Sequence, residues 1–89
     1  MPDFETKSLD LLQQMIDQQR DKLAALARSI NPKLTGEDLL QPHDRPELAA
    51  DPIFNYEDGI LAGLISAQTA LRAALRDPSQ LPLSRKGPA

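Results

Sequence analysis

The chain has 89 residues, enough for one small domain whose hydrophobic core is marginal without a partner. Cysteine is absent, which excludes a disulfide framework, a thiolate metal site and a cysteine nucleophile. The net charge of −3 argues against nucleic acid as the main partner.

The sequence also argues against membrane insertion and export. No stretch is long and apolar enough to span a bilayer. The first residues, with Asp3 and Glu5 close to the start, lack the basic segment and apolar run of a secretory signal. We therefore expect a cytoplasmic protein that makes no membrane contact.

The first long helix is predicted over residues 7–30. Phe4 precedes it and is expected to fold back on the helix. The helix is expected to end at Asn31-Pro32, because a residue that precedes proline is disfavoured in the α region. Seven positions with alternating steps of three and four form the predicted buried seam: Leu9, Leu12, Ile16, Gln19, Leu23, Leu26 and Ile30.

Residues 31–55 are predicted to connect the two long helices and to contain one or two short helical turns. Thr35 is followed three positions later by Asp38, a pattern typical of a capping box. Asp44 is the predicted cap of a second turn, which ends at Asp51-Pro52. This acidic, proline-rich connection either docks a basic partner or solvates the closed end of the hairpin.

The second long helix is predicted over residues 56–76, with Asn55 as its N-terminal cap. Residues 77–89 are predicted to form a flexible tail. The apolar face of this helix is broad enough to contain two adjacent seams, and both remain open. One candidate seam is Leu61, Leu64, Gln68, Leu71 and Leu75, and the other is Ile60, Leu64, Ala67, Leu71 and Ala74.

Small residues recur along the second helix, mostly at steps of four. Glycine costs about 1 kcal/mol relative to alanine inside a helix, so two glycines there require a reason. One reason is the close approach of another helix, and the alternative is an ordinary alanine-rich face that tolerates glycine. The predicted interaction face consists of Gly59, Gly63, Ala67, Ala70 and Ala74.

Gln19 and Gln68 both occupy otherwise apolar seams. If the helices are antiparallel with Ile30 level with Tyr56, the two glutamines share one layer. A buried polar layer of this kind can fix helix register or oligomeric state. The alternative is that both side chains lie at the edge of the seam and reach water.

His43 is the single histidine and lies among the acids Asp38, Asp44 and Glu47. Imidazole and carboxylates can bind zinc or manganese, but the spacing matches no known metal signature. The sequence also contains no nucleophile elbow and no phosphate-binding loop. We therefore predict no catalytic residue, no cofactor and no resident metal.

The predicted fold is all-α: an antiparallel hairpin of two long helices, with residues 1–76 as one domain. We expect it to dimerise into a four-helix bundle, because a single seam leaves the broad face of the second helix exposed. The first functional hypothesis is a small non-enzymatic interaction protein, such as an adaptor, assembly factor or regulatory subunit. The second is a structural subunit of a helical assembly, because the Asn31-Pro32 turn resembles that of the needle subunits of secretion systems. A metal- or ligand-binding domain around His43 is a third.

Overall fold

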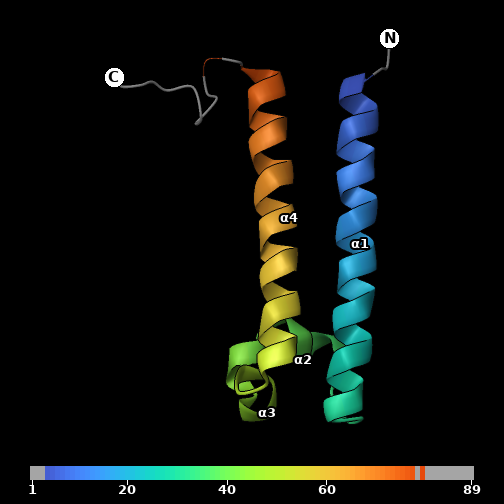
Figure 1. Ribbon diagram of the computed structural model, residues 1–89, viewed down its shortest axis with the longest axis vertical. Helices are drawn as coiled ribbons and strands as arrows, with labels where there is room; N and C mark the ends of the chain where they lie inside the picture. The colour runs from blue at the N-terminus through green and yellow to red at the C-terminus, as the bar shows by residue number, and fades with distance from the viewer. Residues whose placement is uncertain (1–3, 78, 80–89) are drawn as a thin grey trace.

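Two long helices form the body of the molecule. The computed structural model describes residues 4–77 and residue 79, and of His43 only the backbone. Helices α1 (Phe4–Ile30) and α4 (Pro52–Arg76) lie side by side and run in opposite directions (Figure 1). The predicted antiparallel hairpin is therefore confirmed.

The connection between the long helices is itself helical. It contains α2 (Gly36–Leu40), a 3₁₀ turn η1 (Pro42–Asp44) and α3 (Pro46–Ala49). These pieces gather at the end of the hairpin where α1 stops and α4 starts, which we call the closed end (Figure 1). The predicted short turns are confirmed, and no strand occurs in the described part of the chain.

The seam predicted for α1 faces α4 along its whole length. All seven of its residues are buried or half-buried, and Ile16 is only 1% exposed. Two side chains that flank this seam, Leu11 and Met15, remain exposed. The apolar stripe on α1 is thus narrow: α4 packs along it, and α3 and the segment before α2 join at its last turns.

The fully buried core lies at the closed end. Leu48 from α3 is completely enclosed, and Phe54 at the start of α4 is 2% exposed. Leu34, which directly precedes the α2 cap Thr35, joins them against the last turns of α1. The closed end is therefore a small three-sided core, whereas the rest of the hairpin has one helix–helix seam. The core comprises Leu23, Ala27, Leu34, Leu48 and Phe54, with Leu26, Ile30, Leu39 and Leu61 packed against it.

Helix α4 begins four residues earlier than predicted. The Asp51-Pro52 pair starts this helix instead of ending the preceding turn: proline occupies its first turn, where its missing N–H is not needed. The Asp51 carboxylate accepts a hydrogen bond of 2.8 Å from the backbone N–H of Phe54 and is the true cap. The predicted cap, Asn55, lies inside the helix and donates to the carbonyl of Ala49.

Two other local predictions are wrong. Asp44 does not cap α3, because it belongs to the 3₁₀ turn and Arg45 occupies the capping position. Phe4 does not fold back on the helix, because it is the first residue of α1 and is 83% exposed. The end of α4 at Arg76, with Asp77 as its C-terminal cap, is as predicted, while most of the predicted tail (78 and 80–89) lies outside the described residues.

One of the two candidate seams on α4 faces α1. Leu61, Leu64 and Leu71 are half-buried and Gln68 is buried, whereas Ile60 and Ala67 of the competing seam are exposed. The same three-and-four spacing continues backwards through Glu57 to Phe54, both of which are buried. The two seams of the hairpin are therefore matched heptad patterns, one on each helix.

Candidate functional site

The second stripe on α4 is exposed and carries no charge. Each residue of this stripe directly precedes a residue of the buried seam in the chain, so the stripe covers the adjacent side of the helix. Its first three members are large, and Ile53 and Tyr56 are 63% and 69% exposed. The remaining members are small, and only Ala74 is half-buried. The stripe is Ile53, Tyr56, Ile60, Gly63, Ala67, Ala70 and Ala74.

Helix α1 has a matching stripe, whose residues again directly precede those of its buried seam. Phe4, Leu11 and Met15 lie on it, and their side chains are 83%, 58% and 41% exposed. Both helices are right-handed and they run antiparallel, so the residue that precedes a seam residue points to the same side of the hairpin on each. The two stripes therefore form one continuous surface. We call it the apolar face and define it by the seven stripe residues of α4 together with the stripe on α1, which consists of Phe4, Ser8, Leu11, Met15, Gln18, Lys22, Ala25 and Ser29.

The apolar face contains a single charged position. Lys22 lies on the α1 stripe, and its Nζ is 3.1 Å from Oε2 of Glu57. The other stripe positions on α1 are Ser8, Gln18, Ala25 and Ser29. A partner that covers this face consequently meets apolar and small side chains, the polar Gln18 and one charge that already has a counter-ion.

The opposite side of the hairpin is different. The stripe that follows each seam carries charged residues such as Asp17, Arg20 and Asp58. A hollow of about 620 Å³ opens there between α1, α2 and α4, with Leu39 and Leu61 among its apolar lining and Arg20 at its rim. Helix α2 thus partly covers this side near the closed end, while the apolar face has no such cover among the described residues.

The predicted small-residue face coincides with part of the apolar face. Gly63, Ala67, Ala70 and Ala74 are on the α4 stripe, while Gly59 lies further round the helix, away from α1. A Cβ atom built at Gly59 or Gly63 would meet nothing within 4 Å. The described chain therefore makes no close helix contact at either glycine, and a close approach by a separate helix stays a prediction.

The predicted interaction face did not include the large side chains of this surface. Ile53 was assigned to the connection and Tyr56 was placed at the start of the helix, so neither was joined to the small residues. The available signal was the three-and-four spacing, which continues from Gly63 back through Ile60 and Tyr56 to Ile53.

A buried carboxylate lies in the seam near the closed end. Glu57 is 9% exposed, and Gln19 Nε2 donates to both its Oε1 and its backbone carbonyl at 2.8 Å. The Gln19 side chain and then the Lys22 ammonium lower the pKa of Glu57 from its ordinary value of 4.5, against the opposing effect of partial desolvation. The carboxylate is thus held charged and serves as the polar link between the two helices.

The two glutamines do not share a layer. Gln68 Nε2 donates to Oε1 of Gln13 at 2.9 Å, about three helical turns along α4 from the Gln19–Glu57 contact. The expected register was wrong because α4 starts at Pro52 and not at Tyr56, which changes the level of each of its residues. Gln68 is buried and Gln19 half-buried, each with its own partner on the facing helix.

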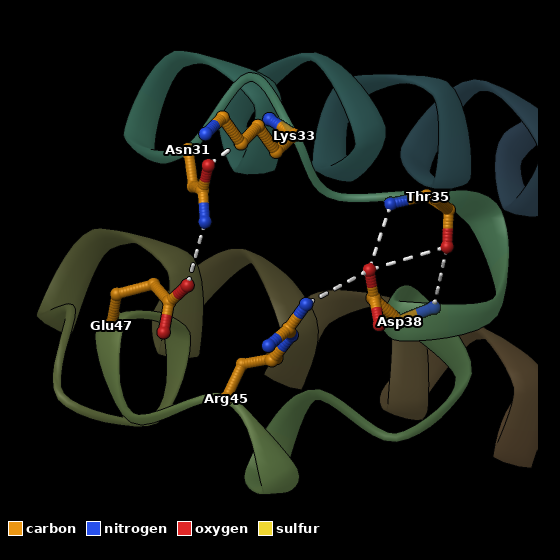
Figure 2. Close-up of polar contacts among 6 residues, drawn as sticks. All are labelled: Asn31, Lys33, Thr35, Asp38, Arg45 and Glu47. Carbon is orange, nitrogen blue, oxygen red and sulfur yellow. Dashed lines mark hydrogen bonds and ion pairs between the residues drawn. The ribbon is translucent and has the colours of Figure 1, made fainter.

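The acidic residues of the connection hold its turns together (Figure 2). Asp38 accepts from the backbone N–H of Thr35 at 2.9 Å, and the Thr35 hydroxyl accepts from the Asp38 N–H, which completes the predicted capping box. Asp38 also accepts from Arg45 at 3.3 Å. Asn31 donates to the Glu47 carboxylate at 2.9 Å, tying the end of α1 to α3. These contacts account for the two carboxylates without a bound partner.

The pKa values of these carboxylates agree with that role. The hydrogen bond from the Thr35 backbone is the main cause that lowers the pKa of Asp38, and Arg45 adds to it. The hydrogen bond from Asn31 is the main cause that lowers the pKa of Glu47. Both acids are thus stabilised in their charged form by local structural contacts.

The metal hypothesis gains no support from the geometry. The His43 side chain lies outside the description, and the described residues contain no group of three or more His, Asp or Glu side chains placed to hold a metal ion. The described helices also include none with the length and hydropathy that crossing a bilayer requires.

Comparison with known proteins gives no match. No family model, no curated protein and no solved structure matches this chain.

Proposed function

We propose that this protein is a small, non-enzymatic interaction protein that acts through helix–helix contacts on the apolar face. An adaptor, an assembly factor and a regulatory subunit all work in this way. The supporting observation is that the large exposed apolar side chains of the two long helices, with the exception of Leu75, gather on one side of the hairpin. Contiguous apolar surface of this kind is typical of protein–protein contact sites.

The chemistry of the face favours a helical partner. Its stripes follow the heptad spacing of a helix–helix seam, and small residues at Gly63, Ala67 and Ala70 allow a backbone to come close. The single charge, Lys22, is paired with Glu57 inside the chain. A partner helix therefore needs apolar residues at steps of three and four and no matching charge.

The proposal can be tested by labelling single-cysteine variants in a native extract of cells of the source organism, because the natural chain contains no cysteine. Ala67→Cys places a thiol on the apolar face, and Thr69→Cys places one on the opposite side of the same helix. Both native residues are exposed in the isolated chain. A maleimide reagent should modify the cysteine of Ala67→Cys several-fold more slowly, because a bound partner covers it.

Labelling in urea provides the control, since both thiols should then react at the same rate. Equal labelling rates in the native extract would refute an interaction role for this face, whichever partner had been expected.

A further inference from the structure

We propose that a second copy of this chain covers the apolar face, with α4 packed antiparallel on α4 of the other copy and a two-fold axis close to Gly63. This inference rests on the proposed function and names the partner for the same surface. The arrangement is a closed four-helix bundle in which both copies use the same face.

The α4 stripe is self-complementary about Gly63. Its large residues, Ile53, Tyr56 and Ile60, lie before the glycine, and its small residues lie after it. An antiparallel two-fold axis at Gly63 places Ile60 opposite Ala67 of the second copy. By the same symmetry Tyr56 lies opposite Ala70, and Ile53 lies opposite Ala74.

Each large side chain thereby meets a small one, as close packing between helices requires. Gly63 at the crossing point has open space around its Cβ position and is exposed, so a second backbone can approach there. A parallel pairing would instead set large residues against large ones at one end and leave gaps at the other.

Helix α1 gives an independent indication of the same axis. The contacts of Gln13 with Gln68 and of Gln19 with Glu57 place Met15 close to the level of Gly63. A two-fold axis at Met15 sets Phe4 near Ala25 of the second copy.

Phe4 thus meets a small residue, while Leu11 lies near Gln18 and the Met15 side chains of the two copies meet at the axis. The same operation sets Lys22 near Ser8 of the second copy, so that like charges do not meet across the contact. One axis is thus compatible with the residues that both helices of the hairpin present on this face.

The size of the face matches that of a stable dimer contact. A helix of 27 residues, such as α1, is about 40 Å long, and two adjacent helices together are about 20 Å wide. The resulting area of about 800 Å² is what each partner contributes to a typical specific interface. A second hairpin has the same length and width, and so it covers the face fully.

Disulfide trapping with purified single-cysteine variants tests the register. We expect an equimolar mixture of Ile60→Cys and Ala67→Cys to form mainly the mixed disulfide dimer on mild oxidation, because those positions face each other across the axis. Mass spectrometry separates the mixed dimer from the two homodimers, since the variants differ in mass. Thr69→Cys on the opposite side serves as the background control, and circular dichroism verifies that each variant remains helical.

A statistical mixture of mixed and homodimeric products would overturn the antiparallel register. Cross-linking no greater than that of Thr69→Cys would overturn self-association altogether. In that case, protection of Ala67→Cys in the native extract would still support the interaction role with a different protein, so the two proposals fail separately.

Discussion

The closed end and the arms of this hairpin are built on different principles. At the closed end, α3 and the segment leading into α2 pack against both long helices and enclose Leu48 and Phe54 almost completely. Further along, α1 and α4 pack only on each other among the described residues, and most seam residues there are half-buried. The closed end therefore contains its own core, whereas the arms expose an apolar face that a second layer of helices would cover.

The largest effect should come from truncating the closed-end core. Leu48→Ala removes a fully buried side chain and should lower the free energy of unfolding by about 2–5 kcal/mol in urea titrations. Leu40→Ala is the matched control, because Leu40 belongs to the same end but is 78% exposed. It should change stability by no more than about 0.5 kcal/mol. Similar losses for the two variants would contradict a core at this end.

Acidification should weaken the link between the arms at Glu57. Its pKa is lowered in the folded state, so the carboxylate contributes stability that is fully present above the ordinary value of 4.5. That contribution is lost as the pH falls through the lowered folded pKa. The urea midpoint should therefore drop in acid, and Glu57→Gln should lower it at neutral pH while flattening its pH dependence.

Asp38 and Glu47 also have lowered pKa values, so part of the acid sensitivity should survive in Glu57→Gln. Parallel pH profiles for the natural chain and this variant would show that Glu57 does not link the helices through its charge.

Helix α4 begins at the junction between the closed end and the arms, and Asp51 caps it there. Asp51→Ala removes the acceptor for the Phe54 N–H and should cost about 1 kcal/mol of stability. Asp51→Asn keeps a capping oxygen and should retain most of that stability. Thermal unfolding of the two variants measures the difference, and identical melting temperatures would argue against a cap at this residue.

The smallest effect concerns the outer surface of the arms. Gly59→Ala should stabilise the chain by up to about 1 kcal/mol, because alanine is the better helix former and nothing lies near its Cβ position. Circular dichroism melts test this directly. A destabilised Gly59→Ala would mean that another helix does approach this side of α4.

The sequence predicted the regular parts of this fold and failed at its junctions. The α1 seam was identified in full, because six leucines and isoleucines at heptad spacing, with Gln19 the one polar member, leave little choice of buried face. The start of α4 was misplaced because an aspartate–proline pair suits either the end of one turn or the first turn of the next helix. In the folded chain the Asp51 cap and the packing of Phe54 into the core both accompany the second of these possibilities.

The candidate site was predicted in part for the same reason. Gly63, Ala67 and Ala70 were recognised from their spacing within the predicted helix. Ile53 was not, because the misplaced helix start left it in the connection, and Tyr56 stood at the first predicted residue of the helix. The pairing of Gln19 with Glu57 depends on the register of the two helices, which the connection sets and which a local pattern does not contain.

Sedimentation equilibrium of the purified protein tests self-association through the apolar face most directly. The natural chain and Gly59→Leu should both sediment at twice the chain mass of 9.8 kDa, while Gly63→Leu should shift towards 9.8 kDa because leucine blocks the close approach at the axis. A natural chain that stays at 9.8 kDa across the concentration range would contradict self-association through the apolar face. Open-ended polymers, or equal association by the two leucine variants, would contradict it as well.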